Sequence, residues 1–406
     1  MNVPKLRFPE FRDDWIVKTL GELGKLSGGG TPDRSVTEYW QGNIPWVSSS
    51  DIYEDDIKTI SVTRFINEKS ISESATKIVP KGSVLFVSRV GTGKLAITDI
   101  DVCTSQDFMN FIPKKVSNYF LGYFFIANKS ALISLGQGTS IKGFSKGDLE
   151  KFEVSVPSPL EQQKIADCLS SIDDLITVQT QKLNALKTHK KGLMRQLFPA
   201  EGETLPKLRF PEFQDEGEWK LMPLLKICNI NPSGNDLPNR FIYIDLESVV
   251  SGNLKLKKEI GKDNAPSRAQ RILKDGDVIY QTVRPYQMNN LLCDFADENI
   301  YVASTGYAQL RPLYSSQFLY QLIHTDAFVY KVLSKCTGSS YPAINSTDLA
   351  EISITIPKLL EQNKIADCLS SIDELIAAQT QKLVSLKTHK KGLMQQLFPV
   401  LDEIKR

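Results

Sequence analysis

The strongest constraint on the fold is a long internal duplication. Residues 161–199 and 361–399 align without gaps at an offset of 200, and 32 of their 39 positions are identical. The octapeptide PKLRFPEF stands at 4–11 and again at 206–213, and a tryptophan follows each copy. Two repeats of this length are too few and too large for a solenoid. The duplication therefore predicts two domains built on one plan.

Each copy of the long segment carries a hydrophobic repeat of 3.5 residues, which is typical of a coiled-coil helix. Ser158–Pro159–Leu160–Glu161 predicts a capping box with proline at the first helical position, and Pro199 and Pro399 end the helices. The predicted seam between the two helices consists of Ile165, Leu169, Ile172, Ile176, Leu183 and Leu186 in the first copy and Ile365, Leu369, Ile372, Ile376, Leu383 and Leu386 in the second.

The order of charges along these helices predicts how they pair. Acidic residues such as Asp167 and Asp173 lie in the first half, and basic residues such as Lys187 and Lys190 lie in the second half. Antiparallel pairing places acid beside base along the whole length and opposes the helix dipoles. We therefore predict an antiparallel coiled coil within the chain. The alternative is that each helix packs only as a core helix of its own domain.

The blocks between the repeats predict mixed domains. Short β-type runs occur at 44–47, 83–88 and 152–156 in the first block and at 241–244, 277–282 and 351–356 in the second. One helix is predicted in each block, at 116–135 and at 315–334, and KGSVLFVSR (81–89) resembles DGDVIYQTVR (275–284). The predicted fold class is α+β, with two mixed α/β globular domains joined by two long helices that form an antiparallel coiled coil.

Several loops of both blocks are suited to nucleic acid. The glycine-rich loop 28–32 would let backbone amides approach a phosphate, while Arg and Gln side chains read base edges and Lys, Ser and Thr contact phosphates. The candidate DNA-binding residues are Gly29, Thr31, Ser49, Arg89, Thr92, Lys94, Gln137, Thr139, Ser140 and Lys142 in the first block and Gln281, Arg284, Tyr286, Gln287, Ser339, Ser340 and Tyr341 in the second. Their recurrence at matching places predicts one site in each block.

Composition and motifs exclude several other functions. The 49 basic and 47 acidic residues give a net charge of +2, which excludes a strongly basic nucleic-acid coat. The six cysteines form no CxxC pair and three histidines are few for a metal site. GTGK at 91–94 lacks the Walker pattern, because Ser88 and Leu95 occupy its glycine and Ser/Thr positions. We predict no catalytic residue and no metal ligand.

The hydrophobic pattern also bears on location. The longest mainly apolar run, 119–127, is too short to span a bilayer, and the first residues lack the apolar core of a secretory signal. The expected location is the cytoplasm, with no membrane partner.

The whole pattern resembles the specificity subunit of type I restriction–modification systems. GGGTPDRSVTEYWQGNIPWVSSSDI (28–52) is similar to the opening of a target recognition domain of that family, and SVPSPLEQQKIADCLSSIDDLI (155–176) and ITIPKLLEQNKIADCLSSIDELI (354–376) are similar to its two helical regions. The second block lacks a GGGTP-like loop and has INPSG (230–234) and YIDLE (243–247) instead, so the transfer of site residues is less direct there.

The resemblance implies a division of labour. Residues 1–158 and 200–356 would be target recognition domains, each reading half of a split double-stranded DNA sequence, and 159–199 and 357–406 the helical regions that set the spacer. The helices would seat two modification subunits, which carry S-adenosylmethionine and methylate adenine. Restriction subunits would add ATP-driven translocation and Mg-dependent cleavage. The chain itself would bind no cofactor and catalyse nothing.

Two other classes of function stay open at this point. An enzyme acting alone, such as a nuclease or methyltransferase, requires a cofactor loop or an acidic metal cluster, and neither is found in the sequence. A scaffold that binds only proteins predicts no sequence-selective retention of DNA even when its partners are present.

Overall fold

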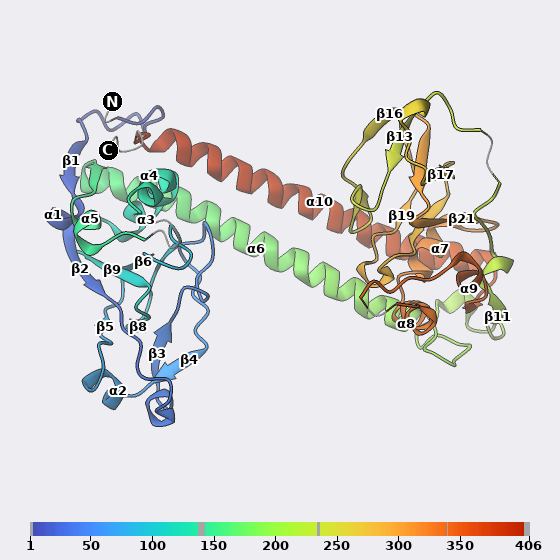
Figure 1. The fold of residues 1–406 in the computed structure, drawn as a ribbon, viewed down its shortest axis with the longest axis horizontal. Helices are drawn as coiled ribbons and strands as arrows, with labels where there is room; N and C mark the ends of the chain where they lie inside the picture. The colour runs from blue at the N-terminus through green and yellow to red at the C-terminus, as the bar shows by residue number, and fades with distance from the viewer. Residues whose placement is uncertain (1–2, 137–142, 234–235, 339, 402–406) are drawn as a thin grey trace. The chain divides into compact units, whose positions relative to one another are not determined.

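The computed structural model describes residues 3–136, 143–233, 236–338 and 340–401, and by its internal contacts the chain divides into two compact units (Figure 1). The first unit is Met1–Thr180 with Gln381–Arg406, and the second is Gln181–Thr380. Each unit therefore holds one α+β block and half of each long helix. The predicted α+β class is confirmed. The predicted bounds of the two recognition domains and the two helical regions stay predictions.

The first unit contains a two-stranded sheet β1–β10 and two four-stranded sheets, β2–β9–β6–β7 and β4–β3–β8–β5, in which only β3 and β8 are parallel. Its strands are β1 (Ile16–Thr19), β2 (Gly24–Gly28), β3 (Ile44–Val47), β4 (Arg64–Ile66), β5 (Ile78–Val79), β6 (Val84–Val87), β7 (Leu95–Ile97), β8 (Val102–Thr104), β9 (Phe108–Pro113) and β10 (Glu153–Val156). Its helices are α1 (Leu20–Leu23), α2 (Glu68–Ser72), α3 (Asn118–Ala127), α4 (Lys129–Ser134), α5 (Lys146–Glu150), the first half of α6 (Pro159–Leu197) and the second half of α10 (Leu359–Leu397).

The second unit repeats this topology with the sheets β11–β22, β12–β21–β18–β19 and β16–β13–β20–β17, and it adds the hairpin β14–β15. Its strands are β11 (Lys220–Pro223), β12 (Cys228–Ile230), β13 (Arg240–Ile244), β14 (Val249–Val250), β15 (Asn253–Leu254), β16 (Lys258–Gly261), β17 (Ala269–Ile272), β18 (Val278–Gln281), β19 (Leu291–Leu292), β20 (Tyr301–Ser304), β21 (Tyr307–Pro312) and β22 (Ser353–Ile356). Its helices are α7 (Ser316–Leu322), α8 (Asp326–Lys335), α9 (Ser346–Ala350), the second half of α6 and the first half of α10 (Leu359–Leu397). The duplication thus extends into the blocks whose sequences differ.

The six predicted strands are confirmed as β3, β6, β10, β13, β18 and β22. β6 and β18, the strands of the two resembling segments, occupy the same place in their sheets and are buried along their whole length. Continuous burial explains why both read as uninterrupted apolar runs rather than as alternating ones.

The prediction of one helix in each block is wrong, because each of the two stretches forms two separate helices. Asn128 ends α3 and its side-chain amide donates to the carbonyl oxygen of Phe124 (3.1 Å). Thr325 has extended backbone and its hydroxyl accepts from the amide of Phe328 (3.2 Å), so it caps α8. Side chains that bond the backbone locally compete with a continuous helix, and these two residues are the sequence signals of the breaks.

The seam residues join the core of each unit. Ile165 and Leu169 of α6 pack in one buried cluster with Met394, Leu397 and Phe398 at the end of the chain's second long helix. In the second unit Ile365 and Leu369 pack in the same way with Leu197 and Phe198. All twelve predicted seam side chains are buried or half-buried. The seven positions at which the copies differ are exposed in both helices, namely 163, 174, 177, 178, 184, 185 and 195 and their equivalents.

Ion pairs confirm that the two long helices run antiparallel. In the first unit Lys390 Nζ lies 2.6 Å from Asp173 Oδ1, and in the second Lys190 Nζ donates to both carboxylate oxygens of Asp373 (2.7 Å each). Each pair joins the basic half of one helix to the acidic half of the other, as the charge order predicts. The alternative was that each helix packs only as a core helix of its own domain. It is partly right, because the ends of both helices contribute to the hydrophobic cores of the units.

The repeated octapeptide ties the start of one long helix to the end of the other. In the first unit Arg7 donates to both oxygens of Glu161 (2.7 and 2.8 Å), and Trp15 Nε1 donates to the same carboxylate (3.2 Å). The amide of Leu6 donates to the carbonyl oxygen of Gln396 (2.9 Å). We call this set of contacts the clamp. It explains why the octapeptide is repeated, which the sequence alone did not.

The second unit carries the same clamp. Arg209 donates to both oxygens of Glu361 (2.8 Å each), Trp219 Nε1 donates to that carboxylate (3.3 Å), and the amide of Leu208 donates to Gln196 O (2.9 Å).

The clamp also corrects the predicted capping box. Ser158 Oγ does accept from the amide of Glu161 (3.4 Å), but the Glu161 carboxylate is directed to Arg7 and Trp15 instead of returning to the cap.

Within the described ranges, no helix combines the length and the apolar character that a membrane crossing requires.

Candidate nucleic-acid interface

Loops from distant parts of the first block meet at one edge of the first unit. The amide and hydroxyl of Ser88 both donate to the carbonyl oxygen of Asp107 (2.8 and 3.0 Å), which joins the loop after β6 to the loop after β8. The amide of Ser105 donates to Val47 O (2.8 Å) at the end of β3, and that of Phe144 donates to Ser88 O (3.1 Å). We call the segments 28–31, 48–51, 88–94 and 105–107 the loop edge of this unit.

The second unit has an equivalent loop edge, formed by 245–248, 281–289, 305–306 and the described part of 338–343. The amide and hydroxyl of Thr282 donate to Gly306 O (3.0 and 2.8 Å), and the amide of Ile344 donates to Thr282 O (3.0 Å). The hydroxyl of Tyr307 donates to Asp245 O (3.3 Å). The loops that recur in the sequence are therefore structurally equivalent.

In the first unit the predicted residues of the loop 88–94 reach the surface. Arg89 is exposed, and Thr92 and Lys94 are half-exposed on a turn whose Gly91 and Gly93 have φ values of +87° and +96°. Ser49 is half-exposed in the turn after β3. The candidates Gln137, Thr139, Ser140 and Lys142 lie outside the described residues.

The interpretation of the glycine-rich loop is wrong. The amide of Gly29 donates to Phe108 O (3.2 Å) and that of Gly30 donates to Thr104 O (2.9 Å), so neither is available to a phosphate. A Cβ at Gly29 would lie 2.1 Å from Ser105 O, and one at Gly30 would lie 2.4 Å from the carbonyl carbon of Ala75. The glycines permit close packing of two chain segments, and Thr31 beside them is half-exposed.

Replacing Gly29 with alanine is expected to destabilise the first unit by about 1–3 kcal/mol, because the new methyl group overlaps backbone atoms that cannot move aside. Gly28→Ala is the matched control, since a Cβ there meets no atom within 4 Å. Urea unfolding of the two variants provides the comparison. Equal stability of Gly29→Ala and Gly28→Ala would contradict the packing role.

In the second unit an arginine–tyrosine pair joins two of the predicted segments. The Arg284 guanidinium lies over the ring of Tyr341 at 4.4 Å, and the amide of Arg284 donates to Pro342 O (2.7 Å). Tyr286, Gln287 and Ser340 are exposed beside them, and Ser339 lies outside the described residues. This part of the loop edge offers a cation, two phenol rings and an amide to a ligand.

Gln281 serves the loop and does not face solvent. It is buried, its Nε2 donates to Val283 O and Gln287 Oε1 (2.8 Å each), and its Oε1 accepts from the amide of Asn289 (3.2 Å). With its amide satisfied internally, it positions the loop that carries Arg284 and is not free to read a base.

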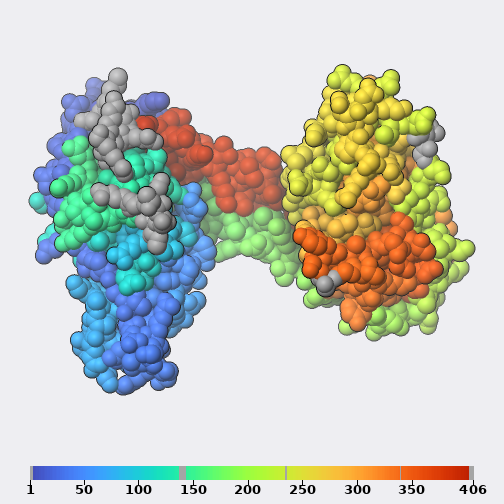
Figure 2. Space-filling model, in the orientation of Figure 1, coloured from blue at the N-terminus to red at the C-terminus, as the bar shows by residue number. Residues whose placement is uncertain are grey.

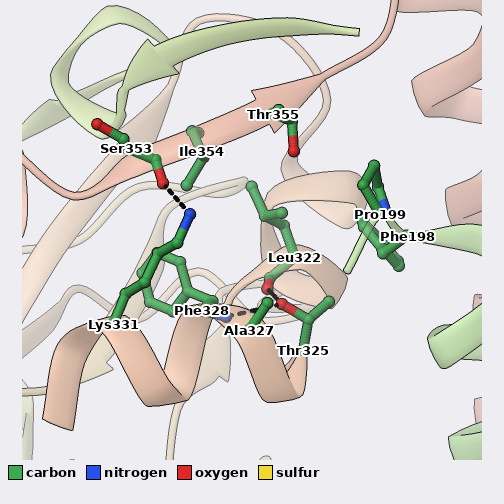
Figure 3. Close-up of a pocket in the computed structure, with 10 residues that line it drawn as sticks. All are labelled: Phe198, Pro199, Leu322, Thr325, Ala327, Phe328, Lys331, Ser353, Ile354 and Thr355. Carbon is green, nitrogen blue, oxygen red and sulfur yellow. Dashed lines mark hydrogen bonds between the residues drawn. The ribbon is translucent and has the colours of Figure 1, made fainter. Parts of the chain in front are cut away.

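Two hollows of the second unit lie outside its loop edge. Among the described residues no group of three His, Cys, Asp or Glu side chains could hold a metal ion. A small cavity of about 30 Å³ lies between the end of α6, α8 and β22, and Figure 3 shows Lys331 donating to Ser353 O beside it (2.8 Å). That volume holds about one water molecule.

A larger hollow of about 410 Å³ in the second unit is walled by His324 and by Arg195, which pairs with Asp326 (2.7 Å). His324 Nδ1 lies 2.6 Å from Tyr320 O, and its Nε2 lies 3.3 Å from the side-chain nitrogen Nδ2 of Asn290. A neutral ring donates at Nδ1 and accepts at Nε2, so both contacts suit the neutral form. Burial lowers the pKa of His324.

We expect the second unit to lose stability below pH 6.5 through His324. The unfolded histidine binds a proton near pH 6.5 and the folded one only at lower pH, so stability is constant above that pH and falls, by up to about 1.4 kcal/mol per pH unit, as the pH decreases toward the folded pKa. Thermal unfolding of His324→Gln should show a shallower decrease between pH 7 and pH 5. His189→Gln, at an exposed position, should keep the wild-type slope; identical slopes for all three proteins would refute the assignment.

The chain has two units of one topology, and each presents different loops at its equivalent edge. This arrangement is typical of a protein with two recognition sites. The chain belongs to the family described as type I restriction modification DNA specificity domain, which it matches twice, over residues 12–188 and 216–388. The chain therefore contains two DNA specificity domains of the kind found in type I restriction–modification systems.

Relatives cover nearly the whole chain. The MjaIX specificity subunit of Methanocaldococcus jannaschii is 27% identical over 95% of this chain and 92% of its own length, and the MjaVIII specificity subunit of the same organism is 25% identical over 97% and 93%. The fold is similar to the crystal structure of the type I S subunit from M. genitalium, with a TM-score of 0.65, 16% identity and coverage of 98% and 100%. The family predicted from the motifs is confirmed.

Proposed function

We propose that this chain is a non-catalytic subunit whose two loop edges each read one half of a bipartite double-stranded DNA site. The antiparallel helix pair sets the spacer and seats two modification subunits, and restriction subunits join that assembly. S-adenosylmethionine, ATP and Mg belong to those partners in this proposal. The observation that carries it is the repetition of one topology with different residues at the equivalent edges.

The number of partner copies has its own support. The long helices are identical at 32 of 39 aligned positions, and the seven differences all fall on exposed positions, so the two ends of the helix pair offer similar but not identical surfaces to solvent. Two similar surfaces in one chain suit two copies of one partner. The loop edges differ between the units, so the two half-sites are expected to differ in sequence.

A map of methylated adenine tests this proposal. A host that expresses the matching modification subunit is sequenced with and without this chain. A split motif with a fixed gap, present only with the chain, is the expected result. Absence of new methylation despite a stable complex would favour a protein scaffold, and cleavage or methylation by the purified chain alone would favour an enzyme.

The helix pair as a spacer makes a separate prediction. Inserting one heptad into α6 and one at the equivalent position of α10 keeps the seam in register and adds about 10 Å of helix. The unread gap of the methylated motif should lengthen, or methylation should disappear. Inserting the same heptad into the linker at 200–204 provides the control, and an unchanged gap in the helix variant would refute the spacer role.

A further inference from the structure

A cavity of about 320 Å³ in the first unit is lined by two arginines and two tryptophans, Arg34, Trp40, Trp46 and Arg64. Trp46 belongs to β3 and Arg64 begins β4, and the two are cross-strand partners in the sheet β4–β3–β8–β5. Figures 1 and 2 show that the blue segment with β3, β4 and α2 forms the part of this unit farthest from its long helices. Sequence reasoning missed this group; its signal is the pair of tryptophans six residues apart between two arginines.

The cavity presents one exposed guanidinium group, that of Arg34, beside the Arg64 guanidinium that the protein already engages. Arg64 Nη2 is engaged by Ser48 Oγ (2.6 Å) and by Asp51, but Arg64 Nε is buried and has no hydrogen-bond partner among the described residues. Arg34 is exposed, and no ion pair to it is found among the described residues. The neighbouring Asp33 carboxylate accepts from the amide and hydroxyl of Ser35 (2.9 and 2.8 Å). With Asp51 neutralising Arg64, Arg34 leaves the lining with a net positive charge.

Contacts within the protein already occupy both indole groups. These contacts favour an anion over a stacked base as the ligand of the cavity. The Arg64 guanidinium lies over Trp46 at 4.9 Å, and Trp40 meets Trp46 edge-on at 5.0 Å and 83°. Both indole N–H groups are used, toward Gly30 O (3.0 Å) and Asp33 O (3.2 Å). Trp46 is buried and has no free face for a stacked base, and its ring holds Arg64 in place. The free donors suit an anion.

The cavity adjoins the loop edge of the same unit. Through Ser48 and Asp51, Arg64 holds the turn that carries Ser49, and Gly30 of the glycine-rich loop receives the Trp46 N–H. A ligand at the loop edge would place its flanking part over the cavity.

We propose that this cavity binds a phosphodiester of the DNA backbone next to the half-site that the first unit reads, with Arg34 as the direct ligand and Arg64 as its support. The inference rests on the proposed function. The contact fixes the position of the duplex and supplies affinity without sequence information. Arg64 supports the site from the side: its Nη2 holds Ser48 and Asp51, and its stacking on Trp46 holds its guanidinium rigid.

The test uses the complex of the full chain with its modification subunits and a duplex that contains the methylated motif. Affinity is measured from 50 to 200 mM salt for wild type and Arg34→Gln. Loss of one phosphate contact should reduce the slope of log K against log salt by about 0.9, with the methylated sequence unchanged. Arg34→Lys should retain the slope, and Arg12→Gln, at an exposed position of the same unit, serves as the matched control.

Methylphosphonate substitution locates the contact. Replacing single phosphates by neutral methylphosphonates along the duplex should weaken wild-type binding at one position that no longer matters in Arg34→Gln. An unchanged salt slope, or a change in the methylated sequence, would overturn the phosphate assignment. Failure of the wild-type complex to bind or methylate any motif would instead overturn the proposed function, so the two failures are distinguishable.

Discussion

Replacement of Arg209 by methionine is expected to destabilise the second unit by about 3–5 kcal/mol, because it leaves the carboxylate of Glu361 buried without its cation. Glu361 is 2% exposed and Arg209 10%, and the pair is joined by two hydrogen bonds of 2.8 Å. The same change also frees the start of α10 from the octapeptide that holds the end of α6. The measurement is urea unfolding at pH 7.

Two further variants make this test specific. Arg240→Met removes an arginine that is 77% exposed and paired with Glu259 at 3.2 Å, and it should cost less than about 1 kcal/mol. Replacing both members, Arg209→Met with Glu361→Leu, should recover part of the loss, because no unpaired charge remains. A loss for Arg209→Met no larger than that for Arg240→Met would refute the clamp.

Reversing the charge of Lys390 is the second change with a large expected effect. Lys390 is 9% exposed, its Nζ lies 2.6 Å from Asp173, and Tyr123 donates to the same carboxylate (2.7 Å). Lys390→Glu places two carboxylates together inside the helix pair, and we expect a loss of about 3–5 kcal/mol in unfolding free energy. Lys391→Glu, one residue along and exposed, should change stability by about 0.5 kcal/mol or less.

The exchanged pair tests orientation directly. If loss of the ion pair between Lys390 and Asp173 causes the destabilisation, Lys390→Glu combined with Asp173→Lys should restore a large part of the stability lost in either single variant. No recovery in a double-mutant cycle would mean that the loss arises elsewhere, for example from the contact of Lys390 with the ring of Tyr123.

The local elements were largely predictable, and the errors have identifiable causes. The period of 3.5 residues and the order of charge are properties of contiguous sequence, so they gave the long helices and their antiparallel pairing. The helix breaks at Asn128 and Thr325 were missed because the surrounding stretches are apolar, and apolar pattern outweighed the local hydrogen bonds of two polar side chains.

The site residues were predictable only in part. Arg89, Arg284, Tyr286 and Tyr341 do reach the surface, whereas Gln281 is turned inward, and a residue type alone does not tell an exposed reader from a buried support. The glycine-rich loop looked like a phosphate loop because glycine suits any close approach. Whether the approaching group is a ligand or the protein's own chain depends on sheet register, as at Gly29 and Ser105.

The sequence by itself determined the duplication, the two long helices, their antiparallel pairing and the family, because repeats, periodicity and charge order are written along the chain. Only the tertiary structure decided that each octapeptide clamps both helices, that the loops after β6 and β8 meet, and that Arg34 and Arg64 share one cavity. These contacts join residues from about 20 to several hundred positions apart. They depend on strand register and on the pairing of distant segments, which no local pattern encodes.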